Sequence, residues 1–258
     1  MAQVVLITGA SAGIGAEFAR QYAARGCELV LVARRADALN VLAAELKSKY
    51  GTVSHVVPAD LAEVAAPDAI FSAVTALGVS VDVLVNNAGF GYLSAVTDAP
   101  PEKLLGIVQV NIAALVHLTR LFLPPMISRR SGGVLNVAST AAFVPGPLMA
   151  VYYASKAFVL SFSEALWNEL EGTGVKSSCL CPGATITEFG TASGMDKTPL
   201  FSRAVGMDAA SVASIGVKGL ERNEAVVVCG VANTLAVASS KFFPRKLTAT
   251  MVRKLQTV

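Results

Sequence analysis

Charged residues are scarce in this chain. Only 15% of its 258 residues are charged, 53% are hydrophobic, and the mean hydropathy is +0.58. Disordered proteins have the opposite composition, so that class is excluded. The 21 basic and 18 acidic residues leave a formal charge of +3, which does not indicate a nucleic-acid-binding protein. Either a large covered core or a membrane attachment must accommodate so much apolar sequence.

Cysteine is rare as well. Four cysteines in 258 residues are too few for a disulfide-stabilised scaffold. Cys27, Cys179, Cys181 and Cys229 all stand in apolar segments, which predicts buried free thiols and a reducing, cytoplasmic location. Cys179 and Cys181 are two residues apart, a spacing that does not match the usual Cys-x2-Cys metal pair. We therefore expect no metal site.

Long uninterrupted apolar runs are missing from the C-terminal part and from the start of the chain. A membrane-spanning helix needs roughly 20 consecutive apolar residues. The best late candidate, 225–238, is short and is interrupted by Gly230, Asn233 and Thr234. The first ten residues have no basic segment before their apolar run, so they do not indicate a signal peptide.

Short apolar runs alternate with helical patterns along the whole chain. The seven predicted strands are Val4–Thr8, Glu28–Ala33, Val53–Ala59, Val81–Asn86, Gly133–Ser139, Val175–Cys181 and Ala225–Val228. The predicted helices are Gly13–Arg25, Ala36–Tyr50, Pro67–Ala76, Lys103–Phe122, Tyr152–Glu171 and Ala209–Gly219. Continuous apolar strands between helices are typical of a parallel sheet covered on both faces. With no linker or repeat, residues 1–258 are predicted to form one α/β domain: a Rossmann-type, doubly wound, seven-stranded parallel sheet with helices on both faces.

A glycine-rich turn separates the first predicted strand from the first helix. Gly9, Gly13 and Gly15 follow Thr8 in the pattern G-x3-G-x-G. Such a turn lets the backbone approach a pyrophosphate, and the N-terminus of the next helix favours its negative charge. The alternative is an ordinary tight turn, but its position in a strand–turn–helix unit favours the phosphate site.

Two arginines follow the second predicted strand. Folds of this kind that prefer NAD have an acidic residue near this point, whereas this chain has Ala33, Arg34 and Arg35. A guanidinium can pair with a 2′-phosphate, so NADP(H) is favoured and NAD(H) is the alternative. Asp60, after the third strand, is expected either to accept a hydrogen bond from an adenine amino group or to cap the next helix.

A tyrosine and a lysine share one face of the long helix near residue 160. Tyr152 and Lys156 are four residues apart. A phenol is a poor acid at neutral pH, and a neighbouring ammonium group is expected to lower its pKa. Ser139 ends the preceding strand and could hold a substrate oxygen. Asn111 lies within a predicted helix, where an amide is a mediocre helix former.

These segments resemble the short-chain dehydrogenase/reductase family over essentially the whole chain. The resemblance rests on the Gly9–Gly15 motif, Asn86-Asn87-Ala88-Gly89, Asn111, Ser139, Tyr152-x3-Lys156 and Pro182-Gly183 in the family's order and spacing. It implies that Tyr152 is the general acid or base, that Lys156 lowers its pKa and binds ribose, that Ser139 polarises the carbonyl, and that Asn111 holds a relay water. The implied cofactor-binding residues are Gly9, Ser11, Ala12, Gly13, Ile14, Gly15, Arg34, Arg35, Asp60, Leu61, Asn87, Ala88, Gly89, Tyr152, Lys156, Pro182, Gly183, Thr185 and Thr187.

Two positions depart from the family pattern. Members that prefer NADP(H) often have a basic residue where this chain has Ala12, so Arg34 is left to hold the phosphate, with Arg35 as a helper. Thr185 stands where the family often has Val or Ile. The family also implies a substrate lid, here at 184–205, and a homodimer or homotetramer formed by the helices around Asn111 and Tyr152. Apolar residues in and near the lid, including Phe143, Met149, Phe189, Met195, Leu200 and Phe201, predict an apolar ketone or aldehyde substrate.

The segment 239–258 is a basic tail. No acidic residue occurs from position 225 to the end, where five basic residues alternate with apolar ones. The pattern predicts an amphipathic helix after Pro244. It either docks on the body or a neighbouring subunit, contacts a membrane surface peripherally, or is a mobile tail. Similar tails occur in the family's DltE-like and ketoacyl-reductase-like branches, a looser resemblance than the catalytic one.

The resemblance implies an NADP(H)-dependent carbonyl reductase or alcohol dehydrogenase acting on a small-molecule carbonyl or alcohol. Two alternatives stay open. One is a ketoacyl or steroid reductase at a membrane surface with the tail as its anchor. The other is a cofactor-sensing regulator without catalysis, since fold does not dictate function. A sensor need not retain Tyr152, Lys156, Ser139 and Asn111, which favours the enzyme.

Overall fold

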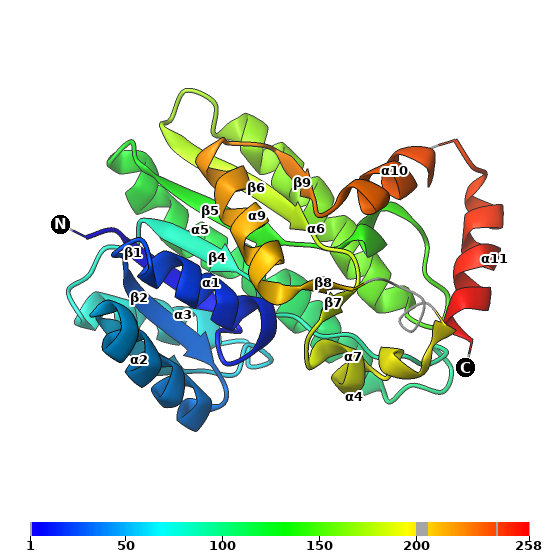
Figure 1. Cartoon of the computed structure of the whole chain (residues 1–258), viewed down its shortest axis with the longest axis horizontal. Coiled ribbons are helices and arrows are strands. Elements are labelled where there is room, and N and C mark those ends of the chain that lie inside the picture. The colour runs from blue at the N-terminus through cyan, green and yellow to red at the C-terminus, as the bar shows by residue number, and fades with distance from the viewer. Residues whose placement is uncertain (1, 200–205, 241, 258) are drawn as a thin grey trace.

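A single parallel sheet organises the protein. The computed structural model describes residues 2–199, 206–240 and 242–257. Seven strands form the sheet in the order β3-β2-β1-β4-β5-β6-β9, and each neighbouring pair is parallel (Figure 1). The strands are β1 Val4–Thr8, β2 Glu28–Ala33, β3 Ser54–Pro58, β4 Val83–Asn86, β5 Gly132–Val137, β6 Val175–Cys181 and β9 Val226–Val228. The predicted seven-stranded, single-domain fold is confirmed.

Helices cover both faces of this sheet. One face carries α1 (Gly13–Ala23), α2 (Ala36–Tyr50) and α9 (Ala209–Glu221); the other carries α3 (Ala66–Ala76), α4 (Pro101–Val108), α5 (Leu115–Ser128) and α6 (Ala150–Glu169). Alternate strand residues serve the two cores: Ile7 packs with Phe18 of α1, and Leu6 packs with Leu118 of α5. The apolar composition is thus largely accounted for by two cores. All four cysteines are free and buried, as predicted.

The helix that precedes β5 is longer than predicted and is irregular. The prediction ended it before Pro124-Pro125, but α4, a π-helical turn (Gln109–Ala114) and α5 form one run from Pro101 to Ser128. The prolines remove only two donors near the helix end, and the final turn is held because Met126 is fully buried. By length and composition this run could cross a membrane; because Leu118 and Phe122 lie in the sheet core, we interpret it as a sheet-covering helix.

The chain after β6 forms small elements that the sequence did not predict. A two-stranded parallel pair joins β7 (Thr185–Ile186) to β8 (Met207–Asp208). Between them lie the short helix α7 (Phe189–Ser193) and a 3-10 turn (Met195–Lys197). The predicted lid, 184–205, thus contains these short elements up to residue 199, and its Leu200 and Phe201 lie outside the described residues.

Two further helices end the described chain. They are α10 (Val231–Ser240) and α11 (Arg245–Gln256), and they lie at one end of the molecule, away from β1 and β2 (Figure 1). The predicted helix after Pro244 is present. We call the pair, residues 231–256, the C-terminal hairpin.

Candidate active site

The predicted site residues converge on one cavity of about 460 Å³ at the carboxyl ends of the strands. Strands β1 and β4 are neighbours although β2 and β3 separate them in sequence, so the loops that follow them diverge and leave a crevice. Of the predicted residues, the cavity is lined by Gly9, Ala12, Gly13, Ile14, Gly15, Arg34, Asn87, Ala88, Gly89, Ser139, Tyr152, Lys156, Pro182, Gly183, Thr185 and Thr187. Ser11, Arg35, Asp60, Leu61 and Asn111 do not line it.

The glycine turn forms a tightly packed cradle in this cavity. Gly9 has a φ of +66°, a conformation that side chains rarely adopt. A Cβ on Gly15 would lie 2.2 Å from the Gly9 carbonyl oxygen, so no other residue fits there. Ala12, at the start of α1, supplies no side-chain cap, and the first turn of α1 has no acidic residue. The N-terminal N–H groups of α1 are therefore available to an anion.

Asn87 joins this turn to the end of β4. Its Nδ2 donates to the carbonyl oxygens of Thr8 and Gly9, at 2.8 and 3.3 Å. In return, the Thr8 hydroxyl accepts from the backbone N–H groups of Asn87 and Ala88, both at 3.0 Å. The Asn87 side chain thus has a positioning role that the sequence did not indicate, and Thr8 is a site residue that was missed.

Arg34 and Arg35 make different contacts. Arg34 lines the cavity, is three-quarters exposed, and its Nη1 lies 3.9 Å from Asp60 Oδ2. Arg35 turns to the glycine turn instead, with Nη2 3.3 Å from the Ser11 hydroxyl and 3.0 Å from Glu188 Oε2. Arg34 is therefore the cation free to meet a ligand, while Arg35 links the turn to the segment after β7.

The residues predicted to meet the adenine lie beside Arg34. Asp60 Oδ1 accepts from the backbone N–H of Ala62 at 3.0 Å and so holds the turn that follows β3. The next helix, α3, begins after Ala65 without a side-chain cap, so the predicted cap of that helix by Asp60 is not found, and its contact with an adenine stays a prediction. The side chain of Leu61 is buried in the core formed with α3 and α5, which leaves only its backbone for a ligand.

Ser139, Tyr152 and Lys156 come together at the inner end of the cavity. Ser139 follows β5, and its hydroxyl accepts from Ala141 N and donates to the Pro182 carbonyl at 3.3 Å. Lys156 is buried and donates from Nζ to the Val137 carbonyl at 2.9 Å. Its Nζ lies 5.9 Å from the centre of the Tyr152 ring. Helix α6 and the end of β5 thus hold a hydroxyl, a phenol and an amine in one place.

The electrostatics of this group differ from the sequence-based expectation. Burial raises the pKa of Tyr152 to about 12, and the hydrogen bond with Ser139 opposes this only in part. Burial also lowers the pKa of Lys156 to about 8. The expected lowering of the Tyr152 pKa by Lys156 is therefore not found in the protein without cofactor. Burial penalises both the phenolate of Tyr152 and the ammonium of Lys156, and this effect dominates both pKa values.

Asn111 lies behind the cavity, in the π-helical turn. Its side chain is fully buried: Oδ1 accepts from Phe90 N at 3.1 Å, and Nδ2 donates to Ser155 Oγ at 3.0 Å and to the Phe90 carbonyl. A Cβ on Gly89 would be 3.1 Å from Asn111 Oδ1 and 3.3 Å from Lys156 Nζ. Asn111 and Lys156 therefore approach the same glycine, and the predicted relay water stays a prediction. Phe90 and Ser155 were not identified from the sequence.

Apolar side chains close the cavity beyond Tyr152. Phe189 of α7 lies 5.4 Å from the Tyr152 ring, centre to centre, and Met149 and Met195 are buried in the same cluster. Tyr153 completes this cluster. Within the described residues, no group of three His, Cys, Asp or Glu could hold a metal.

The C-terminal hairpin contacts the apolar side chains that close the cavity. Gln256 of α11 is fully buried and donates from Nε2 to the Tyr153 hydroxyl at 2.8 Å. Val252 packs against the apolar cluster around Tyr152 and Tyr153. Asn233 of α10 packs so closely on Gly183 that a Cβ there would lie 2.3 Å from its Nδ2. Neither Asn233 nor Gln256 was identified from the sequence.

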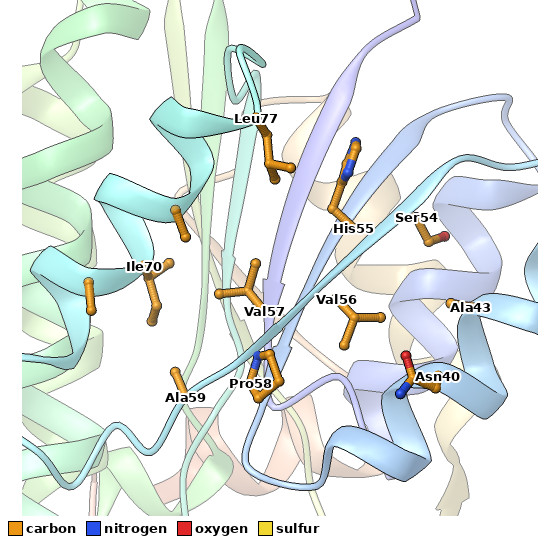
Figure 2. A pocket seen from close by; sticks show the side chains of 12 residues that line it. Asn40, Ala43, Ser54, His55, Val56, Val57, Pro58, Ala59, Ile70 and Leu77 are labelled. Carbon is orange, nitrogen blue, oxygen red and sulfur yellow. The ribbon is translucent and has the colours of Figure 1, made fainter.

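A second hollow, of about 710 Å³, lies along β3 between α2 and α3 (Figure 2). Its lining is mostly small or apolar, with Val56, Val57, Pro58 and Ile70 labelled in the view. Its histidine, His55, has Nε2 2.6 Å from Glu28 Oε1. The predicted site residues do not line it, and its side chains offer little chemistry, so the cavity at Tyr152 is the candidate active site.

Comparison with known proteins agrees with this geometry. The sequence model described as short chain dehydrogenase matches residues 3–198. A very-long-chain 3-oxoacyl-CoA reductase of Pyrenophora tritici-repentis is 40% identical over 179 residues, which cover 68% of this chain and 52% of that protein. The chain thus spans about half the length of the curated relatives it matches first.

Solved structures share the fold over nearly the whole chain. A short-chain dehydrogenase from Sphingobium yanoikuyae in complex with NADPH is 31% identical, with a TM-score of 0.82 and 93% of each chain covered. A short chain dehydrogenase/reductase from Burkholderia phymatum in complex with NAD is 27% identical, with a TM-score of 0.82 and 92% of each chain covered. A nicotinamide cofactor is common to both neighbours.

Proposed function

Since this chain belongs to the short-chain dehydrogenase/reductase family, we propose that it is an NADP(H)-dependent reductase of apolar ketones or aldehydes, or the corresponding alcohol dehydrogenase. That it is an oxidoreductase acting on CH–OH or carbonyl groups follows from the family. The cofactor preference, the substrate class and the roles of individual residues are our proposal. The convergence of Ser139, Tyr152 and Lys156 beside the glycine cradle is the observation that carries it.

The cavity fits a dinucleotide. The uncapped start of α1 and the glycine cradle suit a pyrophosphate, because a Cβ on Gly15 would fill the space that the backbone needs. Pro182, Gly183 and Thr187 also line the cavity, and they would hold the nicotinamide. When bound, the cofactor supplies or accepts the hydride. Lys156 is placed to bind the nicotinamide ribose.

The protein's own part is to hold the carbonyl and move a proton. The Ser139 hydroxyl would donate a hydrogen bond to the substrate oxygen, and the Tyr152 phenol would give that oxygen its proton. Because burial holds the pKa of Tyr152 at about 12, the phenol is protonated at neutral pH. That is the state needed for reduction, whereas oxidation of an alcohol needs the phenolate.

Arg34 supports the preference for NADP(H). It is exposed and lines the cavity, and its one ionic partner among the described residues is the Asp60 carboxylate at 3.9 Å. It is therefore available to a 2′-phosphate. Asp60 partly offsets this charge, and the known neighbours hold either cofactor. The proposal therefore rests on the arginine rather than on the family.

An apolar substrate is supported by the wall of Met149, Phe189 and Met195 around Tyr152. The Pyrenophora relative is a very-long-chain 3-oxoacyl-CoA reductase. This similarity supports a ketoacyl substrate, rather than a sugar, as the alternative to a simple ketone. A cofactor-sensing role without catalysis is disfavoured, because Ser139, Tyr152 and Lys156 occupy one site.

Two properties of the whole protein complete the proposal. We propose a homodimer or homotetramer, supported by the half-exposed Phe158 and Trp167 on α6, and a cytoplasmic location, supported by the four free thiols.

Replacing Tyr152 by Phe tests the function. NADPH oxidation is followed across a panel of apolar ketones and aldehydes, with Tyr50→Phe on α2 as the matched control remote from the cavity. Loss of the general acid is expected to lower kcat by about 10²- to 10⁴-fold, with NADPH affinity retained. Unchanged turnover in Tyr152→Phe would refute the assigned chemistry, and turnover of no carbonyl by the wild type would favour the sensor.

A further inference from the structure

The C-terminal hairpin carries charge of one sign only. All five charged residues after position 224 are basic: Lys241, Arg245, Lys246, Arg253 and Lys254. Residues 1–224 contain 16 basic and 18 acidic residues, so the rest of the protein is slightly acidic. Four of the five basic residues lie on α11, and they are exposed.

The same hairpin exposes large apolar side chains. Phe242 is 87% exposed, Val231 78% and Leu235 66%, and Phe243, Leu247 and Met251 are also exposed. Six of the 17 large exposed hydrophobic residues of the described chain therefore fall within 231–256. Helix α10 has no charged residue and no buried one. Such a concentration marks an interaction surface.

The opposite side of the hairpin is already fixed to the body. Gln256 is bonded to Tyr153, Val252 packs on the apolar cluster at the active site, and Asn233 packs on Gly183. The exposed side chains therefore belong to the outer side of an anchored element. That outer side needs a partner, because the inner side is used.

The charges of the C-terminal hairpin indicate which kind of partner fits its exposed surface. A two-fold contact between two copies of this surface would bring the eight basic side chains of two α11 helices together without an acidic residue from either hairpin. An anionic lipid surface neutralises the basic residues, takes up exposed Phe, Leu and Met side chains at the headgroup level, and lets Lys and Arg extend to the phosphates. We propose that the C-terminal hairpin docks the protein peripherally on anionic phospholipid membranes.

Vesicle flotation of the full-length protein tests this without substrate or cofactor. The protein is expected to float with phosphatidylcholine vesicles containing about 30% phosphatidylglycerol and not with pure phosphatidylcholine, and to be released by salt at about 0.5 M. Phe242→Ser/Phe243→Ser and, separately, Lys246→Glu/Lys254→Glu are each expected to lower the bound fraction about ten-fold or more. The matched controls Val64→Ser and Lys47→Glu/Lys103→Glu change exposed residues elsewhere and should still bind.

Three results would overturn the proposal. The first is equal flotation with both vesicle types, and the second is full binding by either hairpin variant. The third is a molecular mass in solution that is halved in Phe242→Ser/Phe243→Ser and in no other variant, which would assign the surface to a second copy of the chain. Circular dichroism and thermal unfolding establish that the variants are folded, and the charge variant alters only exposed side chains. Because flotation does not depend on catalysis, a negative result would not bear on the proposed reductase activity. The inactive variant Tyr152→Phe should float as the wild type does.

Discussion

Lys156 is a cation held inside the protein at an energetic cost. Its amine is buried, donates to the Val137 carbonyl, and has its pKa lowered by burial to about 8. A side chain that only packed would not need a charge here. The buried amine therefore costs stability at the position where we propose that the ribose binds, and such a cost is common at functional sites.

The stability difference between Lys156→Met and wild type is expected to depend on pH. In the unfolded chain the amine keeps its proton up to its ordinary pKa of about 10.4, so between pH 8 and pH 10 unfolding takes up a proton. Raising the pH through this window therefore stabilises the wild type but not the variant. Urea unfolding measures the free energy of unfolding of both proteins at pH 7 and pH 10. The value for Lys156→Met minus that for the wild type should fall by on the order of 2–3 kcal/mol from pH 7 to pH 10. A constant difference would contradict the lowered pKa of Lys156.

Arg34 is expected to set the cofactor preference. Arg34→Ala should weaken NADPH binding by about ten-fold or more, since a charge-assisted hydrogen bond contributes roughly 1.5–3 kcal/mol, and should leave NADH binding nearly unchanged. Fluorescence titration of both cofactors measures this, with the exposed Arg222→Ala as the control. Tighter binding of NADH than NADPH by the wild type would reverse the assignment.

Residue types and spacing identified which side chains meet, but not their energetics. The placement of Ser139, Tyr152 and Lys156 was predictable because strand ends and helix periodicity fix it. The raised pKa of Tyr152 was not, because desolvation depends on side chains such as Phe189 that come from a distant segment. The positioning bonds of Asn87 and the burial of Leu61 likewise depend on packing between elements.

Among the elements, the parallel strands were the most predictable. Each is a short apolar run, because both faces of the sheet are covered. The π-helical turn at Gln109–Ala114 was not predictable, since its sequence is compatible with an ordinary helix. The strands β7 and β8 have two residues each and pair only with one another, so they left no periodic pattern to detect.

Helix α11 is expected to tune substrate affinity through Gln256. Among the described residues Gln256 Oε1 has no partner, while Nε2 bonds Tyr153. Leucine at this position removes the unsatisfied acceptor but leaves the buried Tyr153 hydroxyl without its partner, so the free energy of unfolding should fall by about 1–3 kcal/mol at most. Gln256→Leu should change KM for bulky ketones several-fold with NADPH affinity unchanged, and the exposed Thr250→Ala is its control. An unchanged KM would mean that α11 only covers Tyr153.

At the scale of the whole molecule, α6 presents exposed aromatic side chains separate from the C-terminal hairpin. Phe158 stacks on Phe162 with ring centres 6.0 Å apart, and Trp167 is partly exposed. We expect sedimentation to give the mass of a dimer or tetramer, and Phe158→Glu to shift it towards the monomer by placing a charge in the interface. Val64→Glu is the control. A wild-type monomer would exclude this assembly.

The contact between Gln256 and Tyr153 also bears on how the substrate range of such an enzyme can change during evolution. The family match ends at residue 198, yet a side chain near the end of the chain touches the neighbour of the proposed acid. Cradle, acid and amine are all contained in the matched part. Exchange of residues 206–258 between relatives would therefore alter the pocket wall while leaving the reactive groups in place. The protein is in this respect modular: one segment keeps the chemistry constant, and another can diversify what the chemistry acts on.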